Sequence, residues 1–171
     1  ASLISFIFHP LIMPFLGIIT IFKSGTYISV VDPRLMNTTL LIVFLLTVVL
    51  PLSITPFYFY TRLIRKIEMN SNKERLVPYF FTFVFFYVSH VIIKKLPLNY
   101  FFSVYMFAAA ISVLIVLVVS YFWKISTHMV GIGGFIGLTI SLSLRMAVNL
   151  LGILIIAIII AAINASKIVL N

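Results

Sequence analysis

The stretch from Tyr100 to Trp123 reads YFFSVYMFAAAISVLIVLVVSYFW, and it decides the fold class of the chain. It contains no charged residue. It is also longer than the ~20 residues that an α-helix needs to cross a ~30 Å hydrocarbon core. Inside a bilayer the backbone must satisfy its hydrogen bonds internally, which helices and closed barrels alone achieve. The stretch therefore predicts a membrane-spanning helix.

Five other segments have the same apolar character, and the strict two-residue alternation of a barrel strand is absent from all of them. These segments are Leu3–Phe22, Thr39–Tyr60, Val77–Ile93, Ile125–Leu144 and Met146–Ala165. No soluble domain or repeat interrupts the segments. The sequence thus predicts an all-α fold, a polytopic bundle of about six spanning helices that forms a single transmembrane domain over residues 1–171.

Composition agrees with this interpretation and excludes several kinds of chemistry. The chain is 63% apolar and 9% charged, whereas soluble domains average about 45–50% and ~25%. The lack of cysteine excludes disulfides, iron–sulfur clusters and thiol catalysis. Asp32, Glu68 and Glu74 are the only carboxylate side chains, so paired-carboxylate catalysis and a carboxylate metal cage have no candidates. We expect neither a metal nor a cofactor.

The net charge of +9 comes from twelve basic residues against these three acids. In a soluble protein such an excess would suggest nucleic acid. In a membrane protein, anionic lipid headgroups or a phosphate-bearing substrate are the better partners. We therefore expect the lipid bilayer and a lipid phosphate as partners, and no nucleic acid.

With six spans, three basic segments fall on one membrane face. They contain Lys73 and Arg75 in NKERLVPY, Lys124, Ser126 and His128 in KISTHMVGIGG, and Lys167 in ASKIVLN. Cations neutralise phosphate oxygens and the charge that develops in a transition state. An imidazole can donate a proton to a leaving group near neutral pH. These residues are the predicted phosphate site.

A plainer explanation applies to most of these cations, because Lys and Arg near helix ends usually extend toward the headgroups. The Lys124–His128 cluster differs, since ionisable groups between two apolar runs are more often functional. His9 and His90 are interpreted as structural, and we expect His9 to bond a carbonyl that Pro10 leaves free. Gly133 and Gly137 form a GxxxG pair that predicts close helix packing.

The segments FIFHPLIMP, NKERLVPY, WKISTHMVGIGG and ASKIVLN together resemble the type 2 phosphatidic acid phosphatase superfamily, in the short form common in Bacteroidetes. The resemblance spans most of the chain. It implies an α-helical protein with several spans in the bacterial inner membrane. It also implies removal of phosphate from phosphatidate-like or polyprenyl (di)phosphate lipids, without a metal.

The resemblance assigns roles to the site residues. Lys73 and Arg75 resemble the Lys and Arg that precede a Pro in the family's first motif, with shorter spacing. Ser126 and His128 match its PSGH-like motif, which implies that Ser126 binds phosphate and His128 protonates the leaving oxygen. Lys167, with Ser166 before it, replaces the Arg of a Ser–Arg pair, which keeps the charge but loses bidentate binding. Lys124 would add a further cation.

The sequence departs from the family where the nucleophilic His is expected, because that position lies beyond Asn171. Two interpretations follow. In the first, the chain continues past Asn171 and forms a phosphohistidine there. In the second, the protein is a non-catalytic relative that serves as a membrane subunit of a larger complex.

Overall fold

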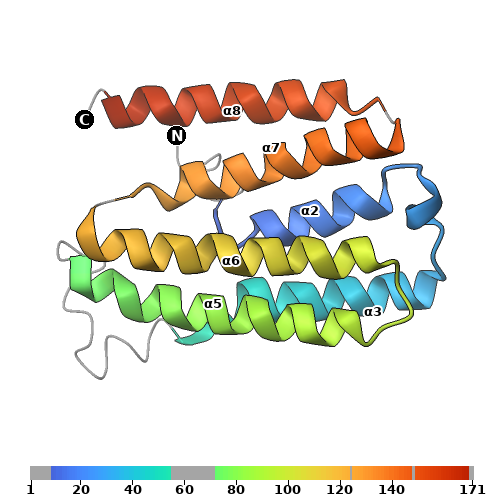
Figure 1. Ribbon diagram of the computed structural model, residues 1–171, viewed down its shortest axis with the longest axis horizontal. Coiled ribbons are helices and arrows are strands. Elements are labelled where there is room, and N and C mark those ends of the chain that lie inside the picture. Colours follow the sequence, from blue (N-terminus) through green and yellow to red (C-terminus); the bar gives the residue numbers. More distant parts are fainter. Residues whose placement is uncertain (1–8, 55–71, 124, 148, 170–171) are drawn as a thin grey trace. The chain divides into compact units, whose positions relative to one another are not determined.

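A computed structural model describes residues 9–54, 72–123, 125–147 and 149–169, with the side chains of 72–75, 164 and 166–169 outside this description. Every regular element in these ranges is helical (Figure 1). The elements are α2 (Met13–Phe22), the 3-10 helix η1 (Tyr27–Ser29), α3 (Pro33–Phe44), the π-helix η2 (Leu45–Val49), α5 (Asn72–Lys94), α6 (Tyr100–Phe122), α7 (Thr127–Met146) and α8 (Leu151–Val169). The predicted all-α class is confirmed.

Four helices in the described ranges are long and apolar enough to cross a membrane, rather than the six expected from the sequence. They are Pro33–Ile54, Leu76–Lys94, Tyr100–Phe122 and Thr127–Met146. Two shorter apolar helices, Met13–Phe22 and Leu151–Ile163, lie where the first and sixth spans were expected. The chain is a membrane protein, and the part of it that the structure describes contains four helices able to span the bilayer.

The described part of the first expected span, residues 9–22, contains the ten-residue helix α2, and residues 3–8 lie outside the described residues. Pro14 occupies the first turn of α2, where its missing amide hydrogen costs nothing. The preceding turn, from His9 to Ile12, is closed by a hydrogen bond from the Ile12 amide to the His9 carbonyl (2.8 Å). At ~1.5 Å per residue, the ten residues of α2 reach only ~15 Å, about half of the hydrocarbon core.

The second span begins six residues earlier than expected, at Pro33 instead of Thr39. The Asp32 carboxylate caps it, accepting from the amides of Arg34 (2.8 Å) and Leu35 (3.4 Å). Hydropathy alone misses this start because the first turn is polar. Further along, the π-helix η2 ends two residues before Pro51. Proline has no amide hydrogen, and in a regular α-helix its ring clashes with the carbonyl four residues earlier, which explains the wider turn at this place.

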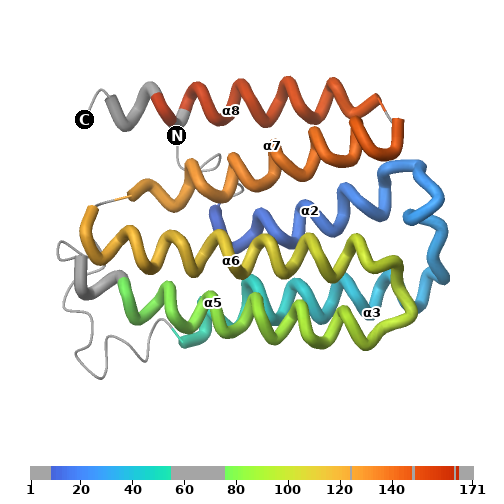
Figure 2. Tube along the Cα trace, viewed as in Figure 1, coloured from blue at the N-terminus to red at the C-terminus, as the bar shows by residue number. Residues whose placement is uncertain are grey.

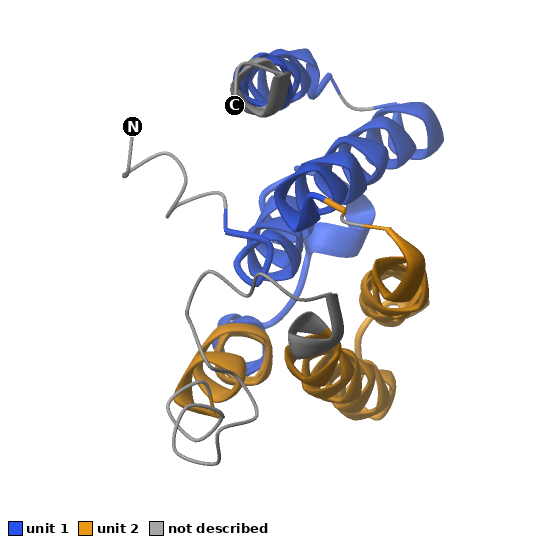
Figure 3. Cartoon of the chain, turned by 90° about the vertical axis from the view of Figure 1, so that its left-hand side faces the viewer, with its two compact units in different colours: residues 1–40, 126–171 blue, residues 41–125 orange. Residues whose placement is uncertain are grey.

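The described chain divides into two compact units (Figure 3), and the single transmembrane domain stays a prediction. One unit, residues 41–125, contains the antiparallel hairpin of α5 and α6 (Figure 2). Asn99 is the N-cap residue of α6, and its side chain accepts a hydrogen bond from the Phe101 amide (3.0 Å). The side chains of Phe86, Ile93, Phe102 and Met106 are buried in this unit.

The other unit joins residues 1–40 to residues 126–171. Met13 of α2, Ile132 of α7 and Ile160 of α8 form its buried cluster. Helix α7 ends at Ala147 in the left-handed conformation (φ 51°), and the Asn149 side chain accepts from the Leu151 amide (3.2 Å) to start α8. Packing against α2 and α8 therefore positions the amino-terminal half of α7.

Candidate functional site

His128 lies in the first turn of α7. Ser126 is the N-cap residue of this helix, and its hydroxyl makes no capping hydrogen bond in the described structure. Both side chains are half-buried. The two candidates from the KISTHMVGIGG segment therefore share one helix end, where unpaired amides and the helix dipole favour anions.

A second imidazole, that of His9, lies directly beside His128. The ring centroids are 5.7 Å apart and the ring planes meet at 87°, an edge-to-face contact. The two residues are far apart in the sequence but belong to the same compact unit. The sequence indicates only a structural role for His9, and no local pattern pairs it with His128.

The pair forms because α2 and its preceding turn run parallel to α7 (Figure 1). His9 meets His128, and one turn further along Met13 packs with Ile132. Gly131 permits this approach: a Cβ there would lie 3.2 Å from the Cα of Pro10 and 3.1 Å from Cγ of Met13. A side chain at position 131 would push away the turn that carries His9.

The GxxxG prediction was wrong in its details. A Cβ added at Gly133 or Gly137 would meet no described atom within 4 Å, so these glycines make no close helix contact in this structure. The close contact is at Gly131, two residues earlier. The expected consequence, that packing at the start of α7 holds His128 against its neighbours, follows from Gly131 instead.

The hydrogen bonding of His9 fixes its neutral form. The Leu11 amide donates to Nδ1 of His9 over 3.4 Å, a long hydrogen bond. Because an amide can only donate, Nδ1 carries the lone pair and the ring proton is on Nε2. Burial lowers the pKa of His9 below its ordinary value, and the charge of a protonated His128 lowers it further. His9 is therefore neutral at pH 7, with an N–H group to donate.

The remaining predicted site residues are placed only in part. Lys73 and Arg75 lie in the first turn of α5, in the unit of residues 41–125, and their side chains fall outside the described residues. Lys124 itself lies outside them. Lys167 belongs to α8, which runs antiparallel to α7, so its backbone lies at the same end as His128 (Figure 1).

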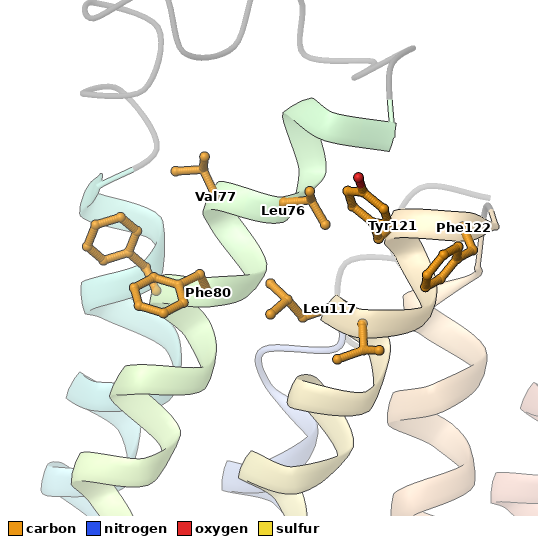
Figure 4. A pocket seen from close by; sticks show the side chains of 8 residues that line it. Leu76, Val77, Phe80, Leu117, Tyr121 and Phe122 are labelled. Carbon is orange, nitrogen blue, oxygen red and sulfur yellow. The ribbon is translucent and has the colours of Figure 1, made fainter.

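An apolar groove of about 600 Å³ opens between α5 and α6, near the first turn of α5 (Figure 4). Its lining is almost wholly hydrocarbon, with the Tyr121 hydroxyl at one end. The groove is lined by Leu76, Val77, Phe80, Phe81, Leu117, Val118, Tyr121 and Phe122. Such a surface suits a hydrocarbon chain and offers little to a polar ligand.

Across the described residues, no group of three or more His, Cys, Asp or Glu side chains is arranged to hold a metal ion. The functional groups in the described part of the site are the imidazoles of His9 and His128, the Ser126 hydroxyl and the amino terminus of α7. Comparisons of the chain with protein-family models, with curated proteins and with solved structures found no match.

Proposed function

We propose that this protein is a membrane lipid phosphatase that takes phosphate from phosphatidate-like or polyprenyl (di)phosphate lipids in the bacterial inner membrane. The observation that carries the proposal is the edge-to-face contact of His9 and His128 at the start of α7. Two half-buried imidazoles in a chain with only three carboxylates are its strongest candidates for proton transfer.

In this proposal His128 is the general acid that protonates the leaving oxygen, and Ser126 binds a phosphate oxygen. Lys73, Arg75, Lys124 and Lys167 supply the positive charge that a phosphate ester requires, in the roles that the family resemblance implies. In the family that the chain resembles, a further histidine forms the phosphohistidine, and its expected position follows Asn171. No step calls for a metal or an organic cofactor.

The groove between α5 and α6 supports a lipid as the substrate, rather than a soluble phosphate ester. The apolar residues Leu76 and Val77 line it, and the cationic positions Lys73 and Arg75 come directly before them in the same helix. Cations next to an apolar groove match an anionic headgroup attached to a hydrocarbon chain.

The test is phosphate release from phosphatidate by the full-length protein in phospholipid nanodiscs. His128→Ala should lower the rate by at least about a hundredfold, the usual contribution of a positioned general acid. Gly133→Ala is the matched control on the same helix, because its Cβ would meet open space. A rate for His128→Ala within twofold of the parent would refute the role of His128, and an inactive parent protein would refute the function.

A second candidate function is a non-catalytic membrane subunit, and one observation favours it. Gly133 and Gly137 form a GxxxG pair with open space around them in the described structure, and such pairs let transmembrane helices approach closely. A partner helix in a complex would fill that space. Copurification of a stoichiometric partner that Gly137→Leu abolishes would favour this function over catalysis.

A further inference from the structure

We infer that His9 is a phosphate-binding residue, whose Nε2–H donates a hydrogen bond to an oxygen of the phosphate group held at His128. This inference rests on the proposed function and adds a residue to its site. The motif resemblance gives no role to His9, and the sequence indicates only a structural one. The role comes from the position, the tautomer and the free donor of this ring.

The position of His9 is fixed by the backbone. The turn from His9 to Ile12 closes with a 2.8 Å hydrogen bond, and Pro10 in this turn rests against Gly131. Gly131 is three residues after His128, on the same side of α7. The contact of the two rings is therefore held by backbone packing, which gives a binding group the fixed placement it needs.

The tautomer of His9 is fixed by its neighbour. Since the Leu11 amide occupies the lone pair of Nδ1, the neutral ring must carry its proton on Nε2. No acceptor for that N–H occurs among the described residues. Within residues 9–54, 72–123, 125–147 and 149–169, this N–H is therefore available to a ligand.

The chemistry of the pair then points to an anion as the ligand. A neutral N–H donor beside a second imidazole can bind an oxyanion without placing two positive charges side by side. The helix amino terminus under His128 favours negative charge at the same place. A phosphate group, with several acceptor oxygens, can take a hydrogen bond from the His9 donor, whereas a cation would gain nothing from it.

Two substitutions separate this role from a structural one. His9→Asn places an amide oxygen close to the position of Nδ1, so it can still accept from the Leu11 amide but loses the distant donor. His9→Gln places an amide nitrogen close to the position of Nε2, so it keeps the donor and loses the local acceptor. If His9 binds phosphate, His9→Asn should weaken phosphatidate binding more than His9→Gln does. If His9 only holds the turn, His9→Gln should be the more harmful substitution.

The experiment measures phosphatidate binding by the full-length protein in nanodiscs of phosphatidylcholine with and without phosphatidate. We expect His9→Asn to weaken binding at least about tenfold, the effect of losing one hydrogen bond to a charged group. His9→Gln should bind about tenfold more tightly than His9→Asn, although its melting temperature is the lower of the two. Equal affinities, or weaker binding by His9→Gln, would overturn the inference.

Imidazole ¹⁵N NMR gives an independent readout, because the chain has only three histidines. Phosphatidate should shift the Nε2–H signal of His9 and leave His90, which lies in the other unit, unchanged. Inorganic phosphate added to phosphatidylcholine nanodiscs provides the second arm. A shift with both probes assigns the site to the phosphate group, and a shift with phosphatidate alone assigns it to the lipid.

Failure of the inference and failure of the function give different results. If the parent protein binds phosphatidate and His128→Ala abolishes binding while His9→Asn does not, the function stands and His9 has no part in it. If the parent protein binds neither probe and the His9 signal does not move, both are wrong.

Discussion

His9 and His90 show how one residue type serves two ends in the same apolar chain. Nδ1 of His90 lies 2.8 Å from the carbonyl oxygen of Ser103 and 3.1 Å from its hydroxyl. A carbonyl can only accept a hydrogen bond, so Nδ1 of His90 carries the proton, whereas Nδ1 of His9 accepts a hydrogen bond from the Leu11 amide. In their neutral forms the two rings are opposite tautomers.

The difference decides what each ring can offer to a ligand. The N–H of His90 donates to the Ser103 carbonyl and so links α5 to α6, and the ring packs beside Phe107, with ring centroids 5.1 Å apart. His9 keeps its N–H and lies beside another imidazole. Hydrogen-bond direction therefore separates a histidine that ties two helices together from one that can bind an anion, although both are half-buried near helix ends.

Replacing His9 and His90 by alanine should produce opposite patterns, and this is the largest effect expected in the comparison of the two rings. His90→Ala removes a helix-to-helix hydrogen bond and leaves a cavity, so it should lower the free energy of unfolding by about 2–3 kcal/mol. It should leave phosphatidate binding intact. His9→Ala should weaken binding at least tenfold at a smaller cost in stability.

Thermal unfolding in detergent micelles, followed by the fluorescence of the single tryptophan, Trp123, measures the stability half of this contrast. Phosphatidate binding in nanodiscs measures the other half. The comparison breaks if His90→Ala weakens binding as much as His9→Ala does.

Substitution at two neighbouring glycines should show which packing contact holds His9. Gly131→Ala puts a Cβ within 3.2 Å of Pro10, which should cost about 1–3 kcal/mol of overpacking. Gly133→Ala meets open space, so only the gain in helix propensity of up to about 1 kcal/mol remains. The melting temperature of Gly131→Ala should thus lie below that of Gly133→Ala.

The same pair of variants also reports on the ring contact. Gly131→Ala should reduce phosphatidate affinity, because the turn that carries His9 moves away from His128. Equal stability and equal affinity of the two variants would mean that Gly131 does not position the site.

The fold could be predicted from the sequence where it depends on local composition. The spans of α6 and α5 lie within about a residue of the expected Tyr100–Trp123 and Val77–Ile93, because continuous apolar length is a local property. The start of α3 needed the Asp32–Pro33 capping signal instead of hydropathy. Of the first expected span, only residues 9–22 are described, and there the regular helix begins at Met13, after the turn that contains Pro10.

The site was harder to predict, for a physical reason. His128 stood out because a polar cluster between apolar runs is visible in one stretch of sequence. His9 could be paired with it only through the parallel register of α2 and α7, which Gly131 allows and no local pattern reveals. The side chains of Lys73, Arg75 and Lys167 lie outside the described residues, as does Lys124, so their roles stay predictions.

A substitution at the carboxyl-terminal end of α7 should raise stability without affecting His9 or His128. Ala147 holds a left-handed conformation (φ 51°), which costs an L-residue free energy and suits glycine. Ala147→Gly should therefore stabilise the unit of residues 1–40 and 126–171 by about 0.5–1 kcal/mol, with phosphatidate affinity unchanged. Gly152→Ala, a change in the next helix, is the control for composition. A lower melting temperature for Ala147→Gly would contradict this account of the turn.

The smallest expected effect is a pH dependence of stability that belongs to His9, which lies outside the four spans. Its pKa is lowered in the folded protein, chiefly by burial and then by His128, from an ordinary value of 6.5. As pH falls through 6.5, the unfolded chain takes up a proton that folded His9 does not, so folding stability decreases until the lowered pKa is passed. In α2, the helix that follows His9, no side chain is titratable, so His128 is the charged neighbour to consider. The melting temperature of the parent protein should therefore decline more steeply between neutral and mildly acidic pH than that of His9→Gln. Parallel pH profiles would mean that His9 takes up its proton as readily in the folded chain as in the unfolded one. The folded protein would then not hold His9 as a neutral hydrogen-bond donor, and the contrast with His90 would not stand.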